Sequence, residues 1–268
     1  MKKLGLALSS GGARGFAHIG VIKVLEDNKI PINCVSGTSM GAAIAAYYAL
    51  NLEIRNLEKV LIDFRKRDML KLVDVNDPRV SIVKGKKVRE FLKPFFGNKT
   101  FNDIKIPLAI GATALEDGSK VTFRKGKIID AVMASGAFPG VFPPVKYRGK
   151  HLVDGGLADA TPVDLVNKLG AEVIIAVDLF SLTKNKKRTY SKITDVLGRT
   201  YEIIMSKLAD YKIKGYGKNI VVLQPETGPR IQTFAFYNAK QNIKAGEIEA
   251  KKHLKKIKKL LRWNLLIM

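Results

Sequence analysis

The chain has 268 residues, 46% of them hydrophobic and 26% charged, which is an ordinary globular composition with enough length for a substantial core. Lysine and arginine outnumber acidic residues by 47 to 24, so the net charge is +23; such a charge attracts nucleic acid or an anionic membrane, unless it only reflects a lysine-rich source organism. No apolar run is long enough for a transmembrane helix. The single cysteine, Cys34, excludes an internal disulfide and fits a reducing, cytoplasmic compartment.

Short apolar runs alternate with segments of helical spacing along the chain. The opening MKKLGLALSS is too short in its apolar part for a signal peptide, so we interpret it as a first buried strand. The alternation predicts an α/β fold with a mostly parallel sheet covered on both faces, in a single domain over residues 1–268. The predicted strands are Leu4–Leu8, Cys34–Ser36, Leu108–Thr113, Val121–Phe123, His151–Val153, Val173–Val177 and Ile220–Leu223. The predicted helices are Arg14–Asp27, Met40–Leu50, Ile54–Arg65, Lys86–Phe95, Lys127–Ser135 and Thr161–Leu169.

The first loop, SGGARG at residues 10–15, joins a predicted strand to a predicted helix. A glycine-rich loop at a helix N-terminus presents unpaired N–H groups and allows a ligand to approach the backbone closely. The spacing matches neither the phosphate-binding loop nor the dinucleotide fingerprint. The loop therefore indicates a site for a negative charge, either a phosphate or a transient oxyanion, with a simple tight turn as the alternative.

The second loop, GTSMG at residues 37–41, has the G-x-S-x-G pattern between a strand and a strong helix. In that setting the pattern predicts a nucleophile elbow, where Gly37 and Gly41 let neighbouring backbone cross closely. The N–H of Met40 then faces the same point as the Ser39 hydroxyl. A helix N-cap is the alternative role for Ser39. Both loops leave the carboxyl ends of strands, the edge where sites assemble in parallel sheets.

A serine hydroxyl needs a base to become a good nucleophile. The chain has three histidines, and none is well placed. His18 lies inside the first helix, His151 lies at the wrong end of a strand, and His253 lies among lysines near the C-terminus. We interpret all three as structural or solvated residues, which leaves a carboxylate as the base.

Two aspartates compete for that role. Asp154 ends a strand and is followed by two glycines, and Asp178 ends another strand. Asp117 is typical of a hairpin turn, whereas Asp159 and Asp164 flank a helix start and are interpreted as caps.

Three blocks, SGGARG, GTSMG and DGG, occur in an order that resembles the patatin-like phospholipase family. Further blocks resemble bacterial members: ARGFAHIGVIKVLE, PLAIGATALEDG, ASGAFPGVFPPV and LVDGGLADATPVDL. The resemblance covers roughly residues 3–180. It implies a three-layer α/β/α sandwich and an acyl hydrolase with a Ser–Asp dyad and no histidine. It implies neither a cofactor nor a metal.

Carried over by motif, Ser39 resembles the nucleophile and Asp154 the general base. The family usually begins its first loop with three glycines, and here Ser10 replaces the first of them. Together with the elbow, the resemblance predicts an oxyanion hole formed by Gly11, Gly12, Ala13, Arg14 and Met40. The Arg14 side chain either meets a lipid phosphate or braces the loop.

The remaining segments are less specific. Residues 64–104 are irregular enough to form a cap over a site. Residues 192–268 are predicted to be a mostly helical extension with a strand near residue 220. Its end, 248–268, combines an apolar stripe with a basic face, which suits an anionic bilayer or a helix docked on the core. The stripe consists of Ala250, Leu254, Ile257 and Leu261.

The sequence thus predicts a serine acyl hydrolase acting on the ester bonds of phospholipids or lysophospholipids, peripheral to the inner membrane face. The alternative is a basic regulatory protein that binds nucleic acid or membranes and keeps the fold without turnover. No nucleic-acid recognition motif is present, which argues against specific nucleic-acid binding.

Overall fold

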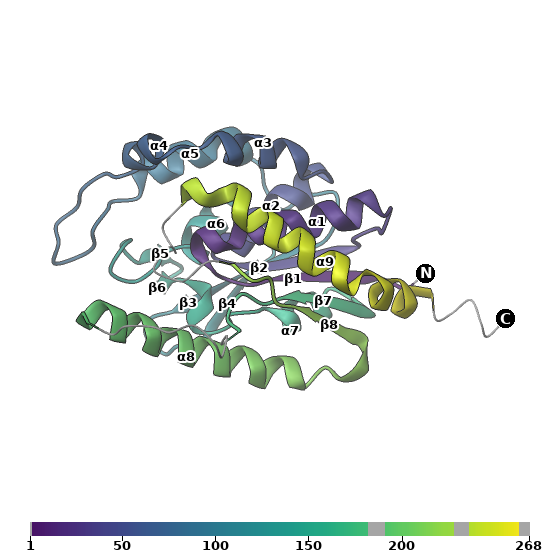
Figure 1. The fold of residues 1–268 in the computed structure, drawn as a ribbon. Coiled ribbons are helices and arrows are strands. Elements are labelled where there is room, and N and C mark those ends of the chain that lie inside the picture. Colours follow the sequence, from purple (N-terminus) through teal and green to yellow (C-terminus); the bar gives the residue numbers. More distant parts are fainter. Residues whose placement is uncertain (1, 182–190, 228–235, 263–268) are drawn as a thin grey trace.

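The computed structural model describes residues 2–181, 191–227 and 236–262 (Figure 1). These residues form one eight-stranded sheet with the order β5-β6-β3-β2-β1-β7-β8, and β4 pairs with β3 beside that path. The strands are β1 Leu4–Leu8, β2 Cys34–Thr38, β3 Leu108–Ala114, β4 Lys120–Phe123, β5 Val145–Tyr147, β6 Lys150–Val153, β7 Val173–Val177 and β8 Ile220–Leu223.

Helices cover both faces of the sheet, so the predicted three-layer α/β/α sandwich is confirmed. In Figure 1, α1, α2 and α9 lie on one face, while α7 and α8 lie on the other. The helices are α1 Ala17–Asp27, α2 Met40–Asn51, α3 Arg55–Asp63, α4 Lys66–Lys71, α5 Lys86–Phe96, α6 Ile128–Ser135, α7 Val163–Asn167, α8 Ile193–Lys214 and α9 Ala239–Arg262. Short 3₁₀ turns are η1 Gly12–Phe16, η2 Gly155–Leu157, η3 Gly217–Asn219 and η5 Phe236–Asn238.

The centre of the sheet is parallel. Strands β1, β2, β3, β7 and β8 run in one direction, and the register pairs Leu8 with both Gly37 and Val177. All residues of β1, β2, β3 and β7 are buried, as expected for apolar strands covered on both faces. This register brings the ends of β1 and β2, which carry the two glycine loops, to the same edge.

One strand, β5, was not predicted, because its three residues include Lys146. The segments β4, β5 and β6 are antiparallel to their neighbours, which agrees with a sheet that is mostly parallel. The predicted helix Arg14–Asp27 is divided into η1 and α1. The predicted helices Ile54–Arg65 and Thr161–Leu169 are shorter, as α3 and α7. The remaining predicted elements differ from the observed ones only near their ends.

Helix α9 packs on α1 with very close backbone contact. A Cβ on Gly20 would lie 2.0 Å from the carbonyl oxygen of Ile243, and one on Gly246 would lie 1.9 Å from that of Ala17. The apolar stripe of α9 faces this contact, since Ala250 and other members of the stripe are buried. Of the two roles the sequence left open, the structure therefore has the stripe docked on the core. Residues 263–268 of that prediction lie outside the described residues.

On the opposite face, Cys34 points from β2 toward α7. Its thiol is 2% exposed and donates to the carbonyl oxygen of Val166 at 3.9 Å. Burial raises the pKa of the Cys34 thiol to about 11. Along the described ranges, no helix is both long and apolar enough to cross a bilayer.

Candidate active site

Ser39 occupies the turn between β2 and α2 with φ 53° and ψ −122°. A positive φ is strained for a residue with a side chain, and such strain is typical of the elbow pattern. The flanking glycines are sterically required. A Cβ on Gly37 would lie 2.3 Å from the carbonyl oxygen of Gly41, and one on Gly41 would lie 2.3 Å from that of Leu8. Ser39 occupies the N-cap position of α2, as the alternative predicted, but its side chain makes no capping hydrogen bond to the helix.

The glycine loop lies against the start of α2. Gly12 opens η1 with φ 57°, and a Cβ on Gly15 would lie 2.4 Å from Cγ of Met40. The first N–H groups of a helix have no acceptor within it. In the described part of the chain, none of the N–H groups of Gly11, Gly12 and Met40 finds an acceptor elsewhere either. Unpaired donors from two elements are thus available beside Ser39.

Arg14 braces this loop. Its side chain is buried, its Nη1 donates to the carbonyl oxygen of Leu179 at 2.8 Å, and its guanidinium lies 5.8 Å from the ring centre of Phe180. Of the two roles that the sequence left open for the Arg14 side chain, the geometry favours bracing.

Asp154 follows β6, which runs antiparallel to β3. The chain then crosses close to the middle of β3, because a Cβ on Gly155 would lie 2.1 Å from the carbonyl oxygen of Gly111. At the next residue, Gly156, an added Cβ would be 3.0 Å from both Oδ1 of Asp154 and Oγ of Ser10. The two glycines of the DGG block therefore allow Asp154 to lie beside the elbow and the glycine loop.

The electrostatic environment of Asp154 is dominated by burial. The side chain is 1% exposed, and burial raises its pKa to about 6 against the smaller, opposite effects of the Ser39 hydroxyl, the Gly156 amide and the Ser10 hydroxyl. The Gly156 N–H donates to Oδ1 at 2.8 Å. Oδ2 has no partner of good hydrogen-bond geometry among the described residues, so the Ser39 hydroxyl lies near the carboxylate without completing a hydrogen bond.

The end of α6 and the residues just after it hold both Ser39 and Asp154 through their backbones. The Ser39 N–H donates to Oγ of Ser135 at 2.8 Å, and that hydroxyl donates to the carbonyl oxygen of Gly111 at 2.6 Å. The Asp154 N–H donates to the carbonyl oxygen of Ala137 at 2.9 Å. Sequence reasoning missed both contacts, and its only signal for them was the ASGAFPGVFPPV block that resembles the family.

The three histidines lie elsewhere, as predicted. His18 is buried, donates through Nε2 to the carbonyl oxygen of Ser9 at 2.8 Å, and has its pKa lowered to about 4, chiefly by burial. His151 pairs with Glu116 at 2.9 Å in an exposed position, and His253 bonds a carbonyl within α9. None of these contacts involves Ser39.

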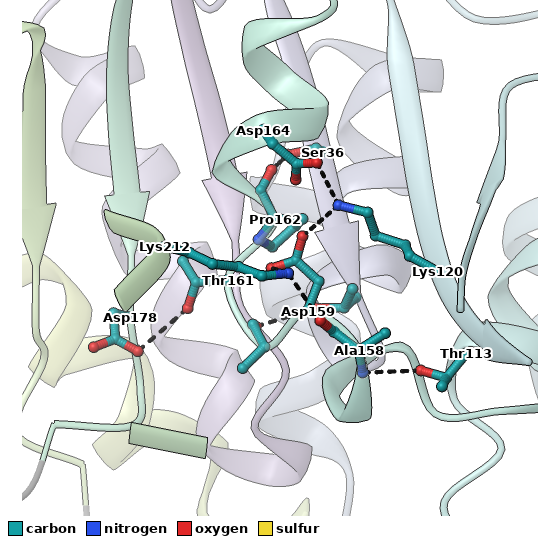
Figure 2. A network of polar contacts seen from close by, with 12 residues as sticks. Ser36, Thr113, Lys120, Ala158, Asp159, Thr161, Pro162, Asp164, Asp178 and Lys212 are labelled. Atoms are coloured by element: carbon teal, nitrogen blue, oxygen red, sulfur yellow. Dashed lines mark hydrogen bonds and ion pairs between the residues drawn. The ribbon is translucent and has the colours of Figure 1, made fainter. Parts of the chain in front are cut away.

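Asp178, the rival base, is buried and well bonded. It accepts from the Phe180 N–H at 3.0 Å, from Nε2 of Gln224 at 3.0 Å and from the Thr161 hydroxyl at 3.3 Å. Figure 2 shows the last contact, which holds Asp178 at the end of β7. Asp117 is a turn residue as predicted, since it accepts from the Ser119 N–H at 2.9 Å.

Asp159 and Asp164 are not helix caps, contrary to the prediction, but members of an ion-pair network (Figure 2). Lys120 Nζ donates to Asp159 at 2.8 Å and also contacts Asp164. Lys212, from α8, lies 3.2 Å from Asp159 and donates to the carbonyl oxygen of Ala158 at 2.8 Å. The network fastens the segment that follows Asp154 to β4 and α8.

The described ranges contain no group of three or more His, Cys, Asp or Glu side chains arranged to hold a metal ion. The groups assembled at the site are therefore a partly exposed hydroxyl, a buried carboxylate and unpaired backbone amides. Such a set suits nucleophilic chemistry at a carbonyl carbon.

The chain is similar in sequence to proteins of bacteria and fungi. An uncharacterized NTE family protein of Mycobacterium bovis is 35% identical over 179 residues, which are 66% of this chain and 49% of that protein. A lysophospholipase of Aspergillus fumigatus, nte1, is 33% identical over 192 residues, 70% of this chain and 13% of that protein. The chain thus spans about half the length of the first relative and a small part of the second.

Among solved structures, VipD from Legionella pneumophila has a TM-score of 0.52 at 15% identity, covering 95% of this chain and 67% of VipD, which shows a shared fold. The family model described as patatin-like phospholipase matches residues 6–167, which include both glycine loops, Ser39 and Asp154. The chain belongs to the patatin-like phospholipase family.

Proposed function

We propose that this chain is a serine acyl hydrolase that cleaves the ester bonds of phospholipids or lysophospholipids. The observation that carries the proposal is the buried Asp154 carboxylate, which lies beside a serine in a strained turn. Family membership and the lysophospholipase name of the fungal relative support a lipid substrate.

In the first half of the proposed reaction, Oγ of Ser39 attacks the ester carbonyl carbon and Asp154 takes the hydroxyl proton. The carbonyl oxygen becomes an oxyanion. The intermediate collapses, the ester C–O bond breaks, and the leaving alcohol takes the proton from Asp154. An acyl-enzyme ester on Ser39 remains.

In the second half, a water molecule attacks the acyl carbon and gives its proton to Asp154. Collapse of the second intermediate returns that proton to Ser39 and releases the fatty acid. Each oxyanion would be held by backbone amides of the glycine loop and the elbow, and removal of one such donor costs roughly 3–4 kcal/mol of transition-state stabilisation. The proposed donors belong to Gly11, Gly12, Ala13, Arg14 and Met40.

Burial makes an aspartate adequate as the base. An ordinary aspartate has a pKa of about 3.9 and is a weak proton acceptor at neutral pH. With its pKa raised to about 6, Asp154 is still mostly ionised at pH 7 but accepts a proton much more readily. The strained backbone of Ser39 keeps the hydroxyl presented toward that carboxylate.

A fluorophosphonate probe tests the proposal because it labels only activated serines. We expect the wild type and the control variant Ser191→Ala to be labelled and to release fatty acid from lysophosphatidylcholine micelles. Ser191 is exposed and lies outside the site. We expect Ser39→Ala to lose both labelling and turnover. Labelling of Ser39→Ala at the wild-type rate would overturn the assignment of the nucleophile.

A further inference from the structure

The segment 65–87, here called the arm, joins α3 to α5 and projects from the end of the molecule at the left of Figure 1. Globular surfaces scatter single apolar residues, but the arm gathers several within one short segment. Five of its apolar side chains are between 39% and 73% exposed: Leu70, Val73, Val75, Val80 and Ile82.

The arm is also strongly basic. It carries eight basic and three acidic residues, for a formal charge of +5. The three carboxylates are already occupied: Asp68 binds Lys71, Asp74 accepts from backbone N–H groups, and Asp77 pairs with Arg79. All eight basic residues are exposed: Arg65, Lys66, Arg67, Lys71, Arg79, Lys84, Lys86 and Lys87. Exposed apolar and cationic side chains are therefore interspersed along one projecting segment.

The arm is tied to the active site by a short path. The N–H groups of Ile82 and Val83 donate to the carbonyl oxygens of Gly140 and Val141, each at 3.0 Å. Gly140 and Val141 are the last residues of the stretch 135–141. Near the start of the same stretch, Ser135 and Ala137 accept hydrogen bonds from the backbone N–H groups of the two dyad residues. A surface that met the arm would thus lie beside the site.

Helix α8 presents a second apolar surface at the same end. Tyr201 packs on Phe138 of that stretch, with ring centres 5.6 Å apart. Because α8 connects the parallel strands β7 and β8, it begins at the carboxyl edge of the sheet, where Ser39 lies. Its exposed apolar residues recur at helical spacing along one face: Ile193, Val196, Leu197, Ile203 and Ile204.

We propose that the arm docks on an anionic lipid bilayer, with its apolar side chains in the headgroup region and its lysines and arginines on lipid phosphates, beside the exposed face of α8. The proposal rests on the function proposed above, in which the substrate is a membrane lipid. Docking there would bring the dyad to the surface from which the substrate comes. Interspersed apolar and basic side chains suit such an interface, in which both kinds of group find partners. A second copy of this chain is a poor occupant, because the arm and the whole chain are positively charged.

Vesicle flotation of the full chain tests the proposal, with vesicles of phosphatidylcholine alone or with one-third phosphatidylglycerol. The arm variant Val80→Ser/Ile82→Ser is compared with Leu52→Ser/Ile248→Ser, whose side chains are also exposed but lie just after α2 and on α9. We expect the arm variant to lower partitioning onto anionic vesicles at least tenfold and the control to change it less than twofold. The wild type should bind neutral vesicles at least tenfold more weakly than anionic ones.

Hydrolysis of a soluble short-chain ester separates this proposal from the proposed function. Both variants should cleave it at the wild-type rate and unfold at the wild-type temperature, while the arm variant alone loses activity on vesicle lipids. If the arm variant loses binding but no protein cleaves any ester, docking stands and the proposed hydrolase is wrong. Unchanged binding of the arm variant, or equal wild-type binding to neutral vesicles, would overturn the docking proposal. Self-association that depends on Val80 and Ile82, in the absence of vesicle binding, would also overturn the docking proposal.

Discussion

Two aspartates in one segment, Asp154 and Asp159, are buried in contrasting ways. Both have a raised pKa, and in both burial is the main cause. Asp159 lies between Lys120 and Lys212, which lower its pKa in turn. Asp154 meets only neutral groups: two hydroxyls and an amide.

The contrast separates a carboxylate in an ion-pair network from the proposed base. Cations beside Asp159 pair with its charge and fasten the segment to β4 and α8, although its pKa is raised to about 6 like that of Asp154. Asp154 has no such partner among the described residues, and its charge is held by weak dipoles that a proton can replace. Burial alone does not identify a general base. A buried carboxylate that lies beside a hydroxyl and has no counter-ion is a much better candidate.

The largest expected effect follows from Asp154→Asn. It removes the proposed base, so we expect kcat/KM to fall by about a thousandfold or more. Because the folded-state pKa is raised, the charged form weakens the fold above about pH 6, and this penalty disappears as the pH falls toward 3.8. The neutral amide should therefore raise the free energy of unfolding at pH 8, by up to roughly 3 kcal/mol. Ester turnover and urea unfolding measure the two effects, and activity within tenfold of wild type would refute the assignment.

Asp159→Asn should leave the chemistry intact. Burial raises the pKa of Asp159 to about 6 as well, so its charged form also weakens the fold above about pH 6, and Lys120 keeps Asp164 as a partner when residue 159 is neutral. We therefore expect the free energy of unfolding at pH 8 not to fall. Turnover of a soluble ester, measured well below the unfolding temperature, should stay within about tenfold of wild type. A folded variant with lost activity would mean that Asp159 takes part in the chemistry.

The smallest expected effect concerns Ser10, which replaces a glycine usual in the family. Its hydroxyl lowers the pKa of Asp154, so Ser10→Ala should raise that pKa further. The acid limb of the pH–rate profile then moves to higher pH, and the rate at pH 6 falls while the rate at pH 8 stays within about twofold. An acid limb that stays in place or moves to lower pH would exclude Ser10 as an influence on the base.

The sequence was sufficient for features that are encoded locally. The alternating elements, the two glycine loops and the DGG block each depend on neighbouring residues, so the sheet and the positions of Ser39 and Asp154 at strand ends could be predicted. Partners distant in the chain could not be predicted. Asp159 and Asp164 resembled helix caps because Lys120 and Lys212 come from other elements. The contacts of Ser135 and Ala137 were missed for the same reason. Periodicity revealed the stripe on α9, but only tertiary packing decides which surface covers it.

The buried thiol of Cys34 can report on global unfolding of this chain. It is the one cysteine, it lies between the sheet and α7, and burial keeps its thiol protonated at neutral pH. Alkylating reagents attack the thiolate, so native molecules should resist them while unfolded molecules react. A brief maleimide pulse would therefore count the unfolded fraction of any variant by mass, without a dye or an engineered label.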